Sequence, residues 1–162
     1  MVEETLTPEN PALPTEQTAS VAAPLTVSAQ YIKDLSFEAP TAPAIYRLIQ
    51  KTPPDVKINV NVSSSRFEHN IHEVTLTIEA NCTVGKDTAF MLELEYAGLF
   101  VVNASPEHIG PLLLIECPRL LFPFARGILA DISRDGGFPP LMLNPVDFVA
   151  MYQAEIDTSK SE

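Results

Sequence analysis

Hydrophobic and polar residues alternate along three runs in the middle of the chain. Apolar side chains occupy every second position from 56 to 62, from 74 to 84 and from 90 to 96, with mostly polar side chains between them. This period of two predicts β-strands that pack one face and leave the other wetter. Residues 85 to 87, Gly-Lys-Asp, separate the last two runs and predict a tight hairpin. A further strand is predicted earlier, from Leu25 to Phe37.

Helical spacing replaces this alternation after about residue 105. The apolar residues between 121 and 132 recur at helical intervals, which predicts a helix that ends at Gly136 and Gly137. Pro118 suits the first turn of this helix. Pro123 is expected to delay its start or to kink its axis, because proline removes a backbone donor.

A second helix is predicted over residues 146–156. Asn144 can serve as its N-cap, Pro145 as its first residue and Asp147 as its third. A short turn of helix also fits between residues 44 and 51, inside a connection that prolines frame. Four strands followed by two main helices predict an α+β fold with a four-stranded antiparallel sheet.

The two ends of the chain differ from the middle in composition. Residues 1–24 combine glutamates and prolines with no basic residue and no apolar period, which predicts a disordered acidic tail. Residues 157–162 are polar and predict a flexible C-terminal tail. The 162-residue chain therefore contains one domain, over residues 25–156.

The chain is strongly acidic. It carries 21 Asp and Glu against 10 Lys and Arg, for a formal net charge of −11. Proteins that bind nucleic acid need clusters of Lys and Arg against the phosphate backbone, so this composition argues against such a partner. The acidity fits either high solubility or a surface that steers basic partners.

No targeting signal is expected in this sequence. The N-terminal segment lacks the basic stretch and apolar run of a secretory signal, and no apolar run approaches the roughly 18 residues of a membrane helix. Cys82 and Cys117 make neither a disulfide framework nor a zinc site. We therefore expect a cytoplasmic protein with reduced thiols that does not insert into membranes.

Two apolar segments suggest contacts beyond a single sheet. The stretch from Gly110 to Leu129 is apolar nearly all round, as in a buried helix. A small domain has little else to surround it, so we expect a homo-oligomer; the open alternative is the central helix of a monomeric core. The loop from Phe138 to Leu143 either walls a groove, to which Met142 would lend adaptability, or packs onto the body.

The sequence predicts no catalytic residue, metal or cofactor. His69 and His72 lie three positions apart on an extended segment, where side chains alternate, and no Cys or carboxylate at metal spacing joins them. Glu93 and Glu95 lie about 7 Å apart on one strand face by strand geometry. This pair indicates a solvated acidic face rather than the two carboxylates of a glycosidase.

Three stretches resemble, in order, the segments of one known family. They read YIKDLSFEAPTAP at 31–43, KDTAFMLELEYAGLF at 86–100 and CPRLLFPFARGILADISRDGGFPPLMLNPVDF at 117–148. All three are similar to SecB, and the resemblance covers residues 27–153. It implies a sheet of four strands with two helices, assembled as a dimer of dimers. It also implies an ATP-independent chaperone that binds unfolded secretory precursors and delivers them to the SecA motor.

The resemblance further implies three sets of site residues. SecA, whose tail in this family is basic and carries its own zinc, would dock on the outer sheet face at Asp34, Glu38, Met91 and Glu93. Clients would bind between the helix-connecting loop and the crossover after the first strand, at Tyr46, Ile58, Val60, Phe138, Leu141 and Met142. Subunits would meet at Leu92, Leu94, Tyr96, Phe122 and Phe124. The chain has no Trp, although the crossover of some family members carries one.

Two functions of other classes remain open on the sequence alone. One is a small acidic adaptor module that binds a single folded partner tightly. The other is a metal-free enzyme that uses a strand carboxylate, for which a small pocket around a buried carboxylate would be needed. Capture of many slow-folding clients without ATP would favour the chaperone over both.

Overall fold

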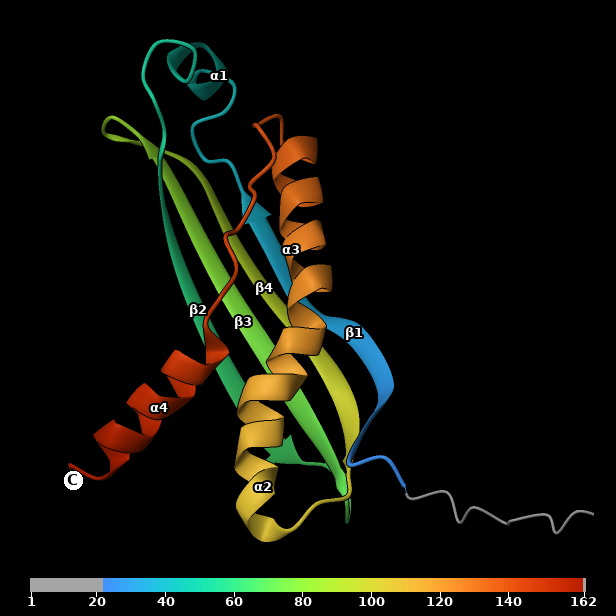
Figure 1. Cartoon of the computed structure of the whole chain (residues 1–162). Coiled ribbons are helices and arrows are strands. Elements are labelled where there is room, and N and C mark those ends of the chain that lie inside the picture. The colour runs from blue at the N-terminus through green and yellow to red at the C-terminus, as the bar shows by residue number, and fades with distance from the viewer. Residues whose placement is uncertain (1–21, 162) are drawn as a thin grey trace, which may run out of the picture.

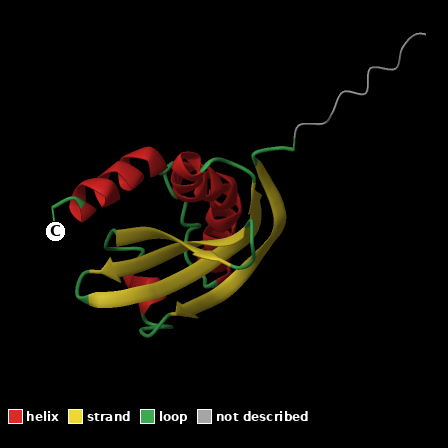
Figure 2. Ribbon diagram, turned by 90° about the horizontal axis from the view of Figure 1, so that it is seen from below, coloured by secondary structure: helices red, strands yellow, loops and turns green. Residues whose placement is uncertain are grey.

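The computed structural model describes residues 22–161 and confirms the α+β fold. Four long antiparallel strands form one sheet in the order β1-β4-β3-β2, with α2, α3 and α4 on one side of it and α1 at one end (Figures 1 and 2). In chain order the elements are β1 (Leu25–Glu38), α1 (Ile45–Leu48), β2 (Asp55–Arg66), β3 (Ile71–Val84), β4 (Asp87–Val102), α2 (Pro106–Pro111), the π-helical η1 (Leu112–Glu116), α3 (Cys117–Asp135) and α4 (Phe148–Ser159).

The period of two sorts the side chains between the two sheet faces. On β3 and β4, residues such as Leu76, Ile78 and Leu94 point to one face and are buried beneath α3, where they meet Leu121 and Leu129. Removal of this apolar surface from water is the main stabilising term of the fold. The polar residues of the same strands lie on the opposite face, which no helix of the described chain covers (Figure 2).

The predicted hairpin and the short helix are both confirmed. Gly85 has φ of 61° in the turn between β3 and β4, a left-handed conformation that glycine adopts without steric cost. The connection from residue 39 to residue 54, which we call the crossover, contains α1 near its middle. In Figure 1 the crossover closes one end of the sheet, beside the C-terminal end of α3.

The long helix α3 begins at Cys117, so Pro118 lies in its first turn as predicted, but the helical structure before it was not predicted. The helical run begins at Pro106, twelve residues before Pro118, and continues through η1 to the end of α3. Pro106 occupies the first helical turn, where its missing N–H costs nothing. Pro123 lies inside α3, and the irregular π-helical turn comes earlier, between Pro111 and Pro118. Such turns rearrange the hydrogen-bond ladder locally, which lets a helix continue through residues that lack a donor.

The boundaries of the last helix also differ from the prediction. Asp147, rather than Asn144, is the N-cap, and its side chain accepts a hydrogen bond of 3.0 Å from the Ala150 amide. The helix runs to Ser159 and so includes the first residues of the segment predicted as a C-terminal tail. The predicted N-terminal tail, residues 1–24, lies outside the described residues except for its last three.

Candidate binding surfaces

An acidic groove runs across the uncovered face of the sheet. It measures about 520 Å³ and takes lining residues from all four strands, among them Glu38, Glu79, Met91 and Glu93. Strand register brings these side chains together, because Glu38 pairs with Met91 and Glu93 pairs with Glu79. Lys57 is the one basic residue among those that line the groove. The groove therefore presents acidic side chains around an exposed methionine.

The residues predicted to dock SecA lie on this face. Glu38, Met91 and Glu93 line the acidic groove, and Asp34 pairs with Glu95 two positions further along β1 and β4. Met91 is 39% exposed, so an apolar contact is available amid the carboxylates. Glu79, from β3, is the acidic residue of the groove that sequence reasoning missed. Its signal was its place on the polar face of the 74–84 run, directly opposite Glu93 in the register.

Six residues before Glu79 on β3, the Glu73 side chain binds two residues of β1. The Glu73 carboxylate accepts hydrogen bonds from the Tyr31 hydroxyl and, at 2.6 Å, from the Lys33 ammonium. Those two bonds, that of Lys33 first, hold the pKa of Glu73 below its usual range. Burial and the bond to Glu73 raise the pKa of Tyr31 to about 12. This cluster ties the edge strand β1 to β3 across β4.

The Glu73 cluster predicts a pH dependence of stability. A lowered carboxyl pKa stabilises the fold above the pKa of the unfolded chain, and this contribution is lost as pH falls through the folded pKa. We expect Glu73→Gln to be less stable than the parent at neutral pH. The two proteins should converge as pH falls below the ordinary range of a glutamate. Urea unfolding at a series of pH values measures this, and a difference that persists at low pH would contradict it.

An apolar groove lies at the end of the sheet where the crossover meets the loop after α3. We call it the crossover groove; it measures about 160 Å³ and is lined by Ile49, Pro54, Val56, Cys82, Phe90, Phe138, Pro139, Pro140, Leu141 and Met142. One wall comes from the crossover and the other from residues 138–143, the loop wall. The floor comes from the helix-side face of β3 and β4. The predicted loop therefore does form one side of an apolar groove.

The structure places the predicted client residues at different depths. Leu141 and Met142 line the groove, and Met142 is 59% exposed. Phe138 is only 4% exposed, because its ring packs against two others. The distance between ring centres is 4.9 Å to Phe90 and 5.3 Å to Tyr46. It is thus mainly a core residue that reaches the groove with one edge.

The remaining client residues lie beside the groove rather than in it. Tyr46 contributes to the aromatic cluster beneath the loop, and its hydroxyl donates a 2.9 Å hydrogen bond to the Gly136 carbonyl. Ile58 and Val60 alternate with Val56 along β2, yet Val56 is the residue of β2 that lines the crossover groove, whereas Ile58 lines the acidic groove. The period of two predicted that these three residues alternate along one strand. Which of them borders the crossover groove depends on where the crossover folds, and the sequence does not show this.

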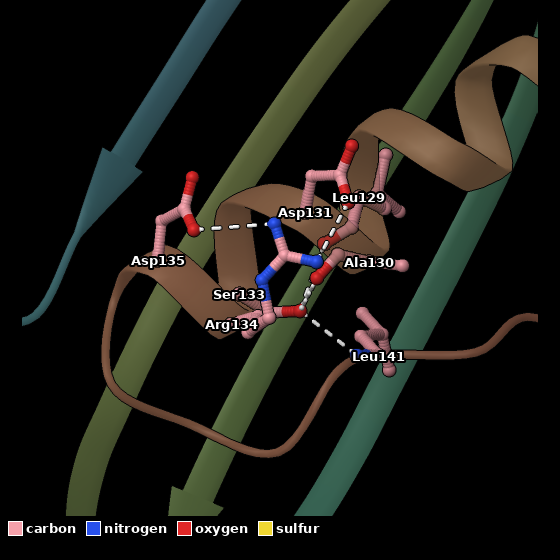
Figure 3. Close-up of polar contacts among 7 residues, drawn as sticks. All are labelled: Leu129, Ala130, Asp131, Ser133, Arg134, Asp135 and Leu141. Carbon is pink, nitrogen blue, oxygen red and sulfur yellow. Dashed lines mark hydrogen bonds and ion pairs between the residues drawn. The ribbon is translucent and has the colours of Figure 1, made fainter.

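Ser133 fixes the loop wall, and sequence reasoning missed it (Figure 3). Its buried hydroxyl accepts a 2.8 Å hydrogen bond from the Leu141 amide and donates to the Leu129 carbonyl at 2.8 Å. Its own carbonyl accepts the Phe138 amide at 3.1 Å. The available signal was a polar residue four positions after Leu129 on the apolar side of a helix.

We expect Ser133→Ala to loosen the loop wall. The substitution would leave the half-buried Leu141 amide without its partner, which costs about 1–3 kcal/mol of folding free energy. Hydrogen exchange at the Leu141 amide should accelerate, and urea unfolding should show the loss of stability. Ser159→Ala, on the exposed end of α4, is the matched control and should change neither. Unaltered exchange at Leu141 in the Ser133 variant would contradict this assignment.

The predicted subunit contacts divide between the core and the surface. Leu92, Leu94 and Tyr96 are buried within the single chain, so they pack beneath α3 and offer little area to another subunit. Phe122 is half-buried, whereas Phe124 is 55% exposed and Leu120 is also exposed one turn earlier. A Cβ added at Gly127, one turn after Phe124, would meet no atom within 4 Å. Of the predicted interface residues, those on the outer side of α3 are therefore the ones that leave apolar surface exposed.

The described residues contain no group of three or more His, Cys, Asp or Glu that could hold a metal ion. Over the same residues, no helix is long and apolar enough to cross a membrane. Cys82 and Cys117 are both free and buried. Burial raises the pKa of the Cys117 thiol to about 12 and also raises that of Cys82, so both thiols stay protonated and unreactive at neutral pH.

Comparison with known proteins gives a consistent result. The family model described as "Preprotein translocase subunit SecB" matches residues 17–159. Protein-export protein SecB of Acidiphilium cryptum is 53% identical, over 82% of this chain and 89% of the relative. The SecB protein of Rhodopseudomonas palustris strain BisB5 is 52% identical, over 85% and 88%.

A solved structure shares the fold at much lower identity. It is a SecB-like chaperone from Mycobacterium tuberculosis in complex with a peptide from an antitoxin. The TM-score is 0.64 at 14% sequence identity, over 77% of this chain and 93% of that one. At this identity the likeness concerns the fold alone.

Proposed function

The chain belongs to the SecB family of protein-export chaperones, and from this we propose that it holds unfolded secretory precursors and passes them to the SecA motor. We propose that it does so in the cytoplasm, without ATP and without catalysing any reaction. The observation that carries this proposal is the position of two unlike surfaces. The apolar crossover groove faces the helix side of the sheet, and the acidic groove faces the other side.

The crossover groove suits an unfolded client. Its lining is almost wholly apolar, so an extended chain that exposes hydrophobic side chains can bury them there. Met142 is exposed and flexible at its rim, and methionine adapts to side chains of varied shape. A folded protein keeps its apolar residues inside, so the groove would select clients by their failure to fold.

The acidic groove suits a basic partner with an apolar residue. The carboxylates of Glu38, Glu79 and Glu93 surround Met91, and complementary charge speeds association and sets register. A SecA docked here would contact the opposite face of the sheet from the client. Both could then be bound at once, as delivery of a precursor requires.

We propose a homotetramer, a dimer of dimers, with the outer side of α3 in one of its interfaces. Leu120 and Phe124 are exposed there, and Gly127 would let a second helix approach closely. Several grooves on one assembly would bind different parts of one long client. Linked weak contacts of this kind raise the overall affinity by orders of magnitude. Family membership favours this function over an acidic adaptor or a strand-carboxylate enzyme.

Refolding kinetics test the proposal. A slow-folding secretory precursor, denatured in urea, is diluted into excess chain without nucleotide, and its intrinsic fluorescence is followed. We expect refolding to be delayed or arrested, because the bound segments are withheld from folding. The native precursor should not bind. Refolding at its unassisted rate in the presence of excess chain would contradict the proposal.

A further inference from the structure

We propose that Tyr46 is a positioning residue that sets the width of the crossover groove. In this assignment its hydroxyl fastens the crossover to the end of α3, and bulky client side chains enter only when this hydrogen bond opens. The inference rests on the proposed function, because it concerns the same groove. Tyr46 was predicted to contact clients. In this assignment it instead determines which client side chains fit into the groove.

The crossover groove is small. At about 160 Å³ it is well below the roughly 300–1,000 Å³ that ligand pockets usually offer. An unfolded segment presents several large side chains in succession, and the groove offers room for few of them at once. The groove must therefore widen before it accepts such a segment, and one of its walls has to move.

The loop wall is fastened to α3 close to the groove. The Leu141 amide donates to the Ser133 hydroxyl and the Phe138 amide donates to the Ser133 carbonyl, at 2.8 and 3.1 Å. Ser133 is fully buried and bonded in turn to its own helix. This wall therefore moves only with α3, which packs against the core of the sheet.

The crossover wall is held to α3 differently. The amides of Ile49, Lys51 and Thr52 donate to carbonyls of the crossover itself, so they do not tie it to the loop. Tyr46 supplies the link, through the 2.9 Å hydrogen bond from its hydroxyl to the Gly136 carbonyl. Its ring also packs on Phe138, with 5.3 Å between ring centres. Opening this hydrogen bond would let residues 49–54 swing away from the loop.

The end of α3 is shaped for this contact. Gly137 has φ of 86°, and a Cβ there would lie 3.1 Å from the Tyr46 ring. Gly136 is equally confined on its other side, where a Cβ would collide with the ring of Phe37. Gly137 therefore does more than follow the helix. Its lack of a side chain lets Tyr46 lie close enough to reach the carbonyl of Gly136, the C-cap of α3.

Tyr46→Phe tests the inference because it removes the hydroxyl and keeps the ring. The probes are an unfolded synthetic peptide rich in phenylalanine and its match in which every phenylalanine is alanine. A neutral hydrogen bond contributes a net amount that corresponds to roughly a two- to tenfold change in an equilibrium constant. We expect Tyr46→Phe to bind the phenylalanine peptide roughly two- to tenfold more tightly by this estimate, and the alanine peptide as before. Tyr152→Phe, on α4, is the matched control and should change neither affinity.

The outcomes separate this inference from the proposed function. Equal changes for both peptides, or none, would overturn the assignment of Tyr46 while leaving the groove as the client site. Failure of the parent chain to bind either peptide would overturn the proposed function itself. A second readout uses the parent protein, with ¹³C at the phenol carbon of its tyrosines. The Tyr46 signal should shift when the phenylalanine peptide binds, and a signal that stays in place would also contradict the inference.

Discussion

Glu93→Lys is expected to weaken docking of SecA about tenfold or more at low salt, while client capture stays intact. Glu93 faces Glu79 across β3 and β4 and lies in the same groove as Glu38. The substitution would place a second ammonium beside Lys57, so a basic partner would meet repulsion where it now meets attraction. The residues that line the crossover groove would be unaffected, since none of them lines the acidic groove.

The measurement is a titration of SecA and of a denatured precursor with each variant. Glu68→Lys, in the exposed turn between β2 and β3, makes the same change in net charge away from the groove and serves as the control. The effect of Glu93→Lys should shrink as salt is added, because exposed charges are screened. Equal losses in both lysine variants would mean that net charge alone governs docking. Loss of client binding together with docking would contradict the separation of the two surfaces.

Phe138→Ala is expected to cost about 3–5 kcal/mol of folding free energy, whereas Met142→Ser should change it by less than about 0.5 kcal/mol. Phe138 is enclosed by the rings of Phe37, Tyr46 and Phe90, and its removal would leave a cavity in the core. Met142 is 59% exposed, so little packing depends on it. Urea unfolding measures both changes.

Among variants that are still folded, the substitution with little effect on stability should be the one that weakens client binding. Met142→Ser removes an apolar contact at the rim of the groove, so its affinity for an unfolded precursor should fall although its stability does not. Phe67→Ser, in the turn between β2 and β3, replaces one exposed apolar residue by serine away from the groove and from the proposed subunit interface, and is the control. A stable Phe138→Ala protein would refute the core assignment. Unchanged client affinity in the Met142 variant would remove this residue from the client site.

The strands could be predicted from the sequence because apolar and polar residues alternate within the strand itself. In β3 and β4, alternate residues are buried over almost the full length, so local pattern and final environment agree. The helices were harder, since four prolines between 106 and 123 suggest interruptions that the folded chain absorbs in one helical run. The burial of its apolar side against the sheet outweighs the missing donors, and this tertiary contribution is not visible in local sequence.

The sequence predicted which site residues share a strand face or a loop, but not how deeply each side chain is buried. Alternation placed Met91 and Glu93 together, the resemblance supplied Glu38, and the register of β1 places Glu38 opposite Met91. Phe138 and Met142 are four residues apart in one apolar loop, yet one is buried and the other exposed. What separates them is the aromatic cluster that Phe37, Tyr46 and Phe90 bring from three distant segments. Leu92, Leu94 and Tyr96 were assigned to an interface for the same reason, because a sequence shows apolar character but not which partner covers it.

Light scattering after gel filtration tests the central claim most directly, with the chain alone, with a denatured secretory precursor and with the same precursor in its native state. The chain alone should have the mass of a tetramer. That mass should rise only when the precursor is added unfolded. A monomer that ignores the unfolded precursor, or a chain that binds the native protein equally well, would contradict it and leave the acidic adaptor as the better description.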